Sequence, residues 1–335
     1  MRSSVRRAVL GTLGALALFG PAVFSGCAVS FSPPGKVNSL RVISVATDKP
    51  YIEPIPADEC EADPDKCTVH FKMDLYDGSG LDRRINILWI GGCFNPDGDQ
   101  YSLCLFPAIE IYNQYKDQLE IVKEGGIPEL PEGVPFGFGP EFSLVVPDIV
   151  SSREAPKFGP HYGIGYVFFL ACAGYFDIIE ENPSAASNFP IGCFDRETKQ
   201  PLGPDSYVPG YTQIYSFADG RQNGLPPVTG ITLDGEVMPE GEPDAGAELI
   251  TVPRCDVPPD ERNQPPSCSR EDPFTACTAY EIQVEVPENV AEVDPDAKGS
   301  DGEPLTETVW VNYLSDNGDF DGAYVWRFTR RATRL

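Results

Sequence analysis

The chain is poor in the residues and motifs that most often carry catalysis or metal binding. It has two histidines, His70 and His161, and three methionines in 335 residues. It contains no Cys-x-x-Cys pair and no histidine-rich cluster, so the ligand spacing of a zinc site is missing. It also lacks a Gly-x-Ser-x-Gly elbow, a Walker loop and a dinucleotide fingerprint. These absences favour a non-enzymatic protein, with an envelope hydrolase that uses two carboxylates as the weaker alternative.

Basic residues are also scarce. The chain has 25 Lys and Arg against 51 Asp and Glu, a net charge of −26, so a phosphate backbone would repel it and nucleic acid is excluded as a partner. Its 32 glycines and 34 prolines interrupt helices too often for a helical bundle. The hydrophobic share of 41% and the aromatic share of 11% are nevertheless enough to build a core.

Long hydrophobic runs are absent after the first 26 residues. The longest candidate, 163–176, is shorter than the roughly 20 residues that a transmembrane helix needs. It is rich in aromatic residues, which is typical of a buried strand.

The N-terminus has the pattern of a bacterial lipoprotein signal. Arg2, Arg6 and Arg7 precede an apolar stretch at 8–19, and FSGC at 24–27 has the small residues of a lipobox before Cys27. In this interpretation Cys27 takes a thioether-linked diacylglycerol and becomes the mature N-terminus, and a further acyl chain makes the anchoring stable. The alternative is an ordinary secretory signal, with Cys27 in a disulfide.

Cleavage before Cys27 divides the first residues into a signal peptide, 1–26, and a tether, 27–38. Because Cys27 is followed by Ala28 and not by Asp, the outer membrane is favoured over the inner membrane. The cleaved segment contains three arginines and no acidic residue. The mature chain therefore keeps 22 basic and 51 acidic residues and has a net charge of −29.

Short strand-like runs joined by Pro- and Gly-rich loops dominate the mature chain. One helix is expected, at 108–123, and the segments between strands offer no alternating helices. We therefore predict an all-β fold with two antiparallel Ig-like β-sandwich regions, long Pro/Gly-rich loops and little helix. The first region, 39–222, carries long insertions, and the second, 223–335, is smaller. The expected strands are 40–45, 68–75, 85–90, 142–146, 162–176, 207–217, 228–233, 248–252, 280–286, 306–313 and 323–329, with a solvated acidic loop at 285–304.

Ten cysteines are many for a reducing compartment and indicate disulfides in an exported chain. With Cys27 set aside for lipid, short loop closure favours four pairs and leaves Cys255 single, although spacing alone does not fix the connectivity. The four pairs are Cys60–Cys67, Cys93–Cys104, Cys172–Cys193 and Cys268–Cys277.

Calcium is the one metal that the sequence suggests. Asn317, Asp319 and Asp321, followed by Gly322, match the first half of a calcium loop, but Phe328 occupies the position of the bidentate glutamate. A hairpin turn is the favoured interpretation. The acidic segments 95–99 and 58–65 are interpreted in the same way, as a turn and a solvated loop.

Tyr207, Tyr211 and Tyr215 share one face of an expected strand. Such a face is either part of the core, which is the favoured interpretation, or a surface on which sugars stack.

Several motifs together resemble a known group of proteins. They are the lipobox cysteine Cys27, SLRVI at 39–43, DKP at 48–50, WIGGCFNP at 89–96 and VPGYT at 208–212. In these features the chain resembles uncharacterised myxobacterial-type outer-membrane lipoproteins with Ig-like β-sandwich regions. The group usually has a short Pro-Gly-Glu turn after Lys-Pro, where this chain has a longer acidic insertion at 53–67. The resemblance implies no catalytic residue.

Two residues are similar to hallmarks of Ig domains. Trp89 matches the tryptophan of strand C and Cys172 the cysteine of strand F, while the partner cysteine of strand B is missing.

The function expected from these observations is that of a non-enzymatic, lipid-anchored cell-envelope protein with a structural or binding role. The alternative is a calcium-stabilised adhesin or a carbohydrate-binding lipoprotein. The expected partners are the membrane, through the lipid anchor, and a protein or a glycan.

Overall fold

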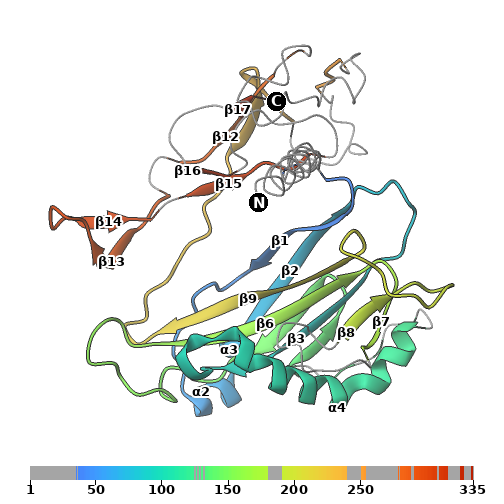
Figure 1. The fold of residues 1–335 in the computed structure, drawn as a ribbon. Coiled ribbons are helices and arrows are strands. Elements are labelled where there is room, and N and C mark those ends of the chain that lie inside the picture. The colour runs from blue at the N-terminus through green and yellow to red at the C-terminus, as the bar shows by residue number, and fades with distance from the viewer. Residues whose placement is uncertain are drawn as a thin grey trace, which may run out of the picture. The chain divides into compact units, whose positions relative to one another are not determined.

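A computed structural model gives the fold of the chain, which divides into two compact units (Figure 1). The larger unit contains Val37–Pro227 and Pro287–Val309, and the smaller unit contains Met1–Lys36, Val228–Val286 and Trp310–Leu335. The structure describes residues 35, 37–123, 126, 128, 130, 133–179, 191–239, 250–253, 278, 280–287, 290–307, 309–315, 325–327 and 333–334.

Two antiparallel sheets form the larger unit, which confirms the predicted all-β class. One sheet has the order β1-β2-β5, with β1 at Leu40–Thr47, β2 at Thr68–Asp77 and β5 at Glu141–Val145. The other has the order β4-β3-β6-β9, with β4 at Phe136–Phe138, β3 at Asn86–Phe94, β6 at Tyr162–Cys172 and β9 at Tyr207–Phe217.

A shared hydrophobic core joins the two sheets. Along β2 the side chains alternate, so that Val69, Phe71 and Met73 are buried while the residues between them are exposed, as the period of two predicts. Trp89 of β3 is fully buried against them, and its ring stacks on Phe142 of β5 with centroids 5.6 Å apart. Trp89 Nε1 donates a hydrogen bond to the carbonyl oxygen of Gly139 (2.8 Å), which satisfies the indole buried in this core.

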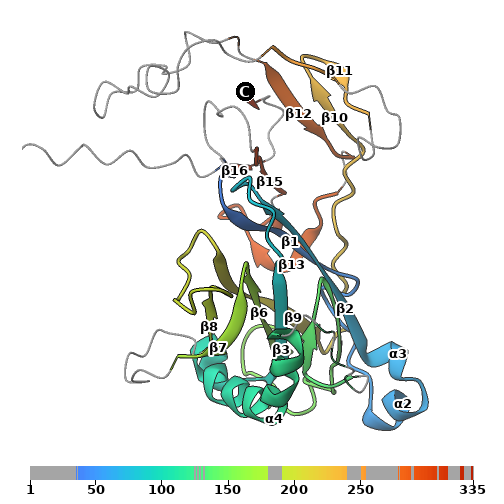
Figure 2. The same ribbon diagram turned by 90° about the vertical axis from the view of Figure 1, so that its right-hand side faces the viewer.

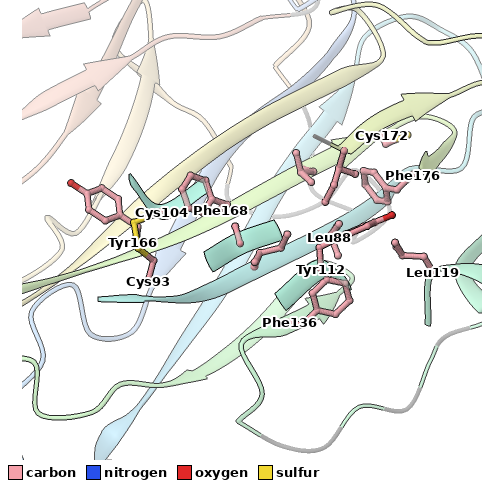
Figure 3. Close-up of a cluster of buried hydrophobic side chains, with 14 of the residues drawn as sticks. Leu88, Cys93, Cys104, Tyr112, Leu119, Phe136, Tyr166, Phe168, Cys172 and Phe176 are labelled. Carbon is pink, nitrogen blue, oxygen red and sulfur yellow. A yellow bond between two sulfur atoms is a disulfide. The ribbon is translucent and has the colours of Figure 1, made fainter. Parts of the chain in front are cut away.

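The second face of β6 belongs to another hydrophobic cluster, which Figure 3 shows in close-up. Helix α4, Leu105–Lys123, lies along this face (Figure 1 and Figure 2). It buries Ala108, Tyr112 and Leu119, whose spacing places them on one side of a helix. The helix begins three residues before its expected start, directly after the short 3₁₀ turn η2 at Tyr101–Cys104.

The acidic insertion departs from the predicted solvated loop, because it contains two short helices, α2 at Ala57–Ala62 and α3 at Pro64–Cys67. Lys49 explains part of this order. Its ammonium group donates to the carbonyl oxygens of Asp65 (2.7 Å), Lys66 (3.3 Å) and Thr68 (2.7 Å). A cation at these carbonyls satisfies acceptors that the end of α3 leaves without partners.

Two hairpins complete the larger unit. β7, Tyr175–Ile178, pairs with β8, Ile191–Phe194. β13, Val293–Lys298, pairs with β14, Pro304–Thr306, so the prediction of a loop throughout 285–304 is wrong. Arg221 forms one ion pair with Asp296 of this acidic hairpin (2.5 Å) and another with Asp219, which follows β9 (2.6 Å).

The smaller unit contains one sheet of four short strands and one strand pair. The sheet has the order β11-β10-β12-β17, and the pair consists of β15, Trp310–Asn312, and β16, Val325–Arg327. The four strands are β10 at Gly230–Leu233, β11 at Glu236–Val237, β12 at Glu281–Glu285 and β17 at Thr333–Arg334. Residues 250–253 lie outside any strand, in contrast to the strand expected at 248–252. A second sandwich in this part of the chain stays a prediction.

Three disulfides confirm that the chain uses its cysteines for cross-links. They join Cys60 to Cys67, Cys93 to Cys104 and Cys172 to Cys193, which are three of the pairs that spacing favours. Cys172 therefore pairs within a local loop and not across the sandwich as in antibody domains. Cys27, Cys255, Cys268 and Cys277 lie outside the described residues.

None of the helices in the described ranges combines the length and the apolar character that crossing a membrane requires.

We predict that the three bridges contribute unequally to stability. Replacing both Cys172 and Cys193 by alanine should cost about 3 kcal/mol of unfolding free energy or more, because the bridge closes a long loop and both sulfurs are buried in the core. Replacing Cys60 and Cys67 should cost less, since that loop is short and Cys60 is half-buried. Equilibrium denaturation of the two double variants compares them, and an equal or larger loss at Cys60–Cys67 would contradict this assignment.

Candidate functional site

The histidine most suited to catalysis lies on the exposed face of the β1-β2-β5 sheet. His70 Nδ1 lies 2.8 Å from Ser143 Oγ, and both residues line an open hollow of about 430 Å³. Asp48 accepts a hydrogen bond from the backbone N–H of His70 (2.8 Å) and not from its ring. In a serine triad the carboxylate must orient the imidazole, so these three residues do not form one. His161 lies elsewhere, with its Nε2 3.0 Å from the carbonyl oxygen of Arg153.

The acidic segments considered as calcium sites do not form a cation site in the part of the chain that the structure describes. Across those residues no three histidine, cysteine, aspartate or glutamate side chains gather in a way that could hold a metal ion. In the turn at 95–99, Asn95 Oδ1 accepts from the backbone N–H of Ile164 (2.9 Å), and Asp99 pairs with Arg153 (2.8 Å). The side chains are thus used for internal contacts. The calcium candidates Asn317, Asp319 and Asp321 lie outside the described residues.

A more promising site is a set of tyrosines beside α4, which we call the tyrosine face. Its position follows from strand register: Tyr211, Gln213 and Tyr215 of β9 pair with residues of β6 that point toward the same side as α4. The helix packs on β3, β4 and β7, so β9 is covered by aromatic rings instead. The tyrosine face consists of Tyr51, Tyr101, Tyr162, Tyr211, Gln213 and Tyr215.

The tyrosine face lies on a lower layer of buried rings. Tyr166 of β6 is buried, with 2% of its surface exposed, and forms the lower layer together with Phe168. Tyr211 contacts both, with centroid distances of 5.7 Å to Tyr166 and 6.2 Å to Phe168, and it stacks on Tyr101 at 4.7 Å. Tyr101 and Tyr211 keep 47% and 43% of their surface exposed, so the upper layer is an accessible aromatic pair. Figure 3 shows Tyr166 at the end of the core cluster where Cys93 and Cys104 are joined.

A second group of rings lies further along β9. Tyr215 is half-buried, with its ring centroid 6.0 Å from that of Tyr51 and 6.1 Å from that of Tyr162. Since Tyr211 and Tyr215 are four residues apart on one strand, the two groups are separated by about 13 Å. Gln213 lies between them on the same face.

A chain of hydrogen bonds fixes these side chains. Tyr215 donates its hydroxyl to Gln213 Oε1 (3.0 Å), Gln213 Nε2 donates to the Tyr166 hydroxyl (3.2 Å), and Tyr166 donates to the Asp99 carbonyl oxygen (2.7 Å). Tyr162 donates to the Asp99 carboxylate (2.6 Å). A connected network of this kind holds its members in one arrangement before any ligand arrives.

Asp99 reaches this position through an unusual turn. Asn95 and Asp99 have φ angles of 48° and 55°, and Gly98 has one of 61°, so two non-glycine residues adopt the left-handed region within five positions. The Cys93–Cys104 disulfide closes the loop that contains them. Such strain persists only where the surrounding structure enforces it, and it concentrates at functional sites.

The environment disfavours ionisation of two phenols of the tyrosine face, Tyr162 and Tyr215. The hydrogen bond to the Asp99 carboxylate, followed by burial, raises the pKa of Tyr162 above its usual value. Burial raises the pKa of Tyr215, and the neighbouring phenols of Tyr166 and Tyr162 add to the effect. The face therefore presents hydroxyl groups that can both donate and accept hydrogen bonds.

Sequence reasoning identified this site only in part. Of the three tyrosines on β9, Tyr207 is half-buried and packs against the core, with its hydroxyl donating to the Ile191 carbonyl oxygen (2.5 Å). Tyr211 is exposed, so the core interpretation is wrong for that residue. Tyr51 and Tyr101 were missed because they come from distant segments whose local patterns carry no signal of a shared surface.

No protein-family model, curated protein or solved structure matches this chain. The site is thus defined by its own geometry, which combines exposed rings, a hydrogen-bonded layer beneath them and a strained, disulfide-closed turn. These features suit the binding of a ligand with both apolar and hydroxyl-bearing surfaces.

We predict that Asp99→Asn lowers the pKa of Tyr162, because the carboxylate charge that disfavours the phenolate is lost. The pKa is raised in the folded state. The resulting stabilisation is therefore complete below the unfolded tyrosine pKa of about 10 and disappears as the pH rises through the folded value. Ultraviolet absorbance of phenolate during an alkaline titration measures the shift, with Tyr162→Phe as the control that removes this group. A titration curve of Asp99→Asn that superimposes on the wild type would refute the assignment.

Proposed function

We propose that this protein is an exported lipoprotein of the bacterial cell envelope, anchored in the outer membrane through Cys27, with a non-catalytic binding role. The observation that carries the proposal is the set of three disulfides in the larger unit. Disulfides form and persist in oxidising compartments, so this use of cysteine supports export.

The leader supports the same conclusion independently. Arginines, a short apolar stretch and the lipobox FSGC at 24–27 precede a tether at 27–38 that separates the anchor from β1. The strong negative charge is suited to solubility at a membrane surface. The resemblance to myxobacterial-type outer-membrane lipoproteins fits this placement.

The strand order supports an Ig-like interpretation of the larger unit. β1, β2 and β5 occupy the positions of strands A, B and E, and β9, β6, β3 and β4 those of G, F, C and C′. In this assignment Trp89 lies on strand C and Cys172 on strand F, as their sequence context suggested. The sandwich supplies a rigid scaffold, and binding is attributed to the tyrosine face and not to the fold as such.

The anchor is tested by metabolic labelling with palmitate in a Gram-negative host. The full chain should incorporate label and fractionate with the outer membrane, because acyl chains on Cys27 hold it there. Cys27→Ala should lose the label and appear in a soluble fraction. The matched control is Cys255→Ala, a change at another cysteine that leaves the lipobox intact and should retain the label. Labelling that persists in Cys27→Ala would rule out the anchor.

A further inference from the structure

We propose that the tyrosine face binds neutral glycan chains. This inference rests on the proposed binding role and assigns it a ligand class. It follows from four properties of the face, namely its exposed rings, their spacing, the polar group between them and their charge environment.

The exposed rings match the apolar side of a sugar. A pyranose presents a patch of C–H groups on each face of the ring, and such patches pack on flat aromatic surfaces. Tyr211 and Tyr101 are stacked with an interplanar angle of 20° and keep nearly half of their surface accessible. Tyrosine provides this contact area at low cost in side-chain entropy, because it has only two rotatable side-chain angles.

The spacing along β9 fits a chain better than a single sugar. Tyr211 and the group formed by Tyr215 and Tyr51 are about 13 Å apart, too far to be covered by one sugar ring. An oligosaccharide lying along the strand would place different units over the two aromatic groups. Two weak contacts on one ligand add through effective concentration, so binding should strengthen as the oligosaccharide lengthens.

Gln213 lies between the two groups and can engage a sugar hydroxyl. Its amide uses one N–H for Tyr166 and one lone pair of Oε1 for Tyr215, so a second N–H and a second lone pair have no partner among the described residues. Gln213 is half-buried, so part of the residue faces solvent. A sugar hydroxyl can accept from the remaining amide N–H and donate to the remaining lone pair of Oε1.

The charge environment selects neutral chains over anionic ones. The chain carries a net charge of −26, which disfavours a polyanion such as a uronide. At the face itself the Asp99 carboxylate is paired with Arg153 (2.8 Å), whose guanidinium lies 5.0 Å from the centre of the Tyr162 ring. The cation is thus already neutralised within the protein and is not available to hold an acidic sugar.

The test uses the purified full-length protein in detergent with defined oligosaccharides. Neutral glucan and chitin oligomers of two, four and six units are titrated by calorimetry, together with oligogalacturonate as the anionic probe. We expect binding to at least one neutral series, with affinity increasing with length, and none to oligogalacturonate. Tyr211→Ala and Tyr101→Ala should each weaken binding about tenfold or more, whereas Tyr211→Phe should retain it.

Tyr76→Ala is the matched control, because Tyr76 lies on β2 and is as exposed as Tyr211, at 45% against 43%. It should leave the affinity unchanged. Circular dichroism and thermal melting check that each variant is folded, and Tyr101, which lies in a short turn, gives an independent result if Tyr211→Ala fails to fold.

Each contrary outcome overturns the inference. One such outcome is no binding to any neutral oligomer, and another is tighter binding to oligogalacturonate. The others are an equal loss of affinity in Tyr76→Ala and Tyr211→Ala, or self-association of the protein that Tyr211→Ala abolishes. The envelope proposal is judged separately. A protein that is acylated at Cys27 but binds no glycan keeps its proposed location and loses this ligand class.

Discussion

The burial of β6 on both faces is the constraint on which the larger unit depends. One face of this strand contributes Val167, Phe169 and Ala171 to the core between the two sheets, and the other contributes Tyr166, Phe168 and Leu170 to the cluster under α4. A strand buried on both sides needs a cover on each, because its apolar side chains would otherwise remain in water. The β1-β2-β5 sheet provides one cover, and helix α4 provides part of the other.

The tyrosine face forms where α4 leaves part of the sheet uncovered. The helix packs over β3 and β4, while the side of the sheet formed by β6 and β9 is covered by rings from Tyr101, Tyr162 and Tyr211. These residues have apolar bodies and polar ends, so they can shield the core and remain compatible with solvent. The same property makes them suitable for a ligand that is apolar on one side and hydroxylated at its edge. Protection of the core and binding are thus two consequences of one arrangement.

The elements predictable from sequence are those with local signals. Alternation in β2, the apolar run of β6 and the short distance between paired cysteines each depend on neighbouring residues, and each has its expected counterpart in the structure. In the acidic insertion, Lys49 donates to carbonyl groups 16 to 19 residues away, at the end of α3, and no local sequence pattern predicts that contact. The tyrosine face draws on Tyr51, Tyr101, Tyr162 and Tyr211, so it exists only after the strands are paired. Its network through Asp99 requires a turn whose strain is imposed by tertiary contacts.

The most direct measurement is the rate of nitration of individual tyrosines by tetranitromethane, followed by peptide mass spectrometry of the native protein. If rings at the surface protect a buried layer beneath them, Tyr101 and Tyr211 react early, while Tyr112 and Tyr166 react only after unfolding. A bound neutral oligosaccharide should then slow modification of Tyr101 and Tyr211 and leave exposed Tyr76 unaffected. Early nitration of Tyr166 in the native protein, or a ligand that protects Tyr76 and not Tyr211, would contradict the two-layer face and its role in binding.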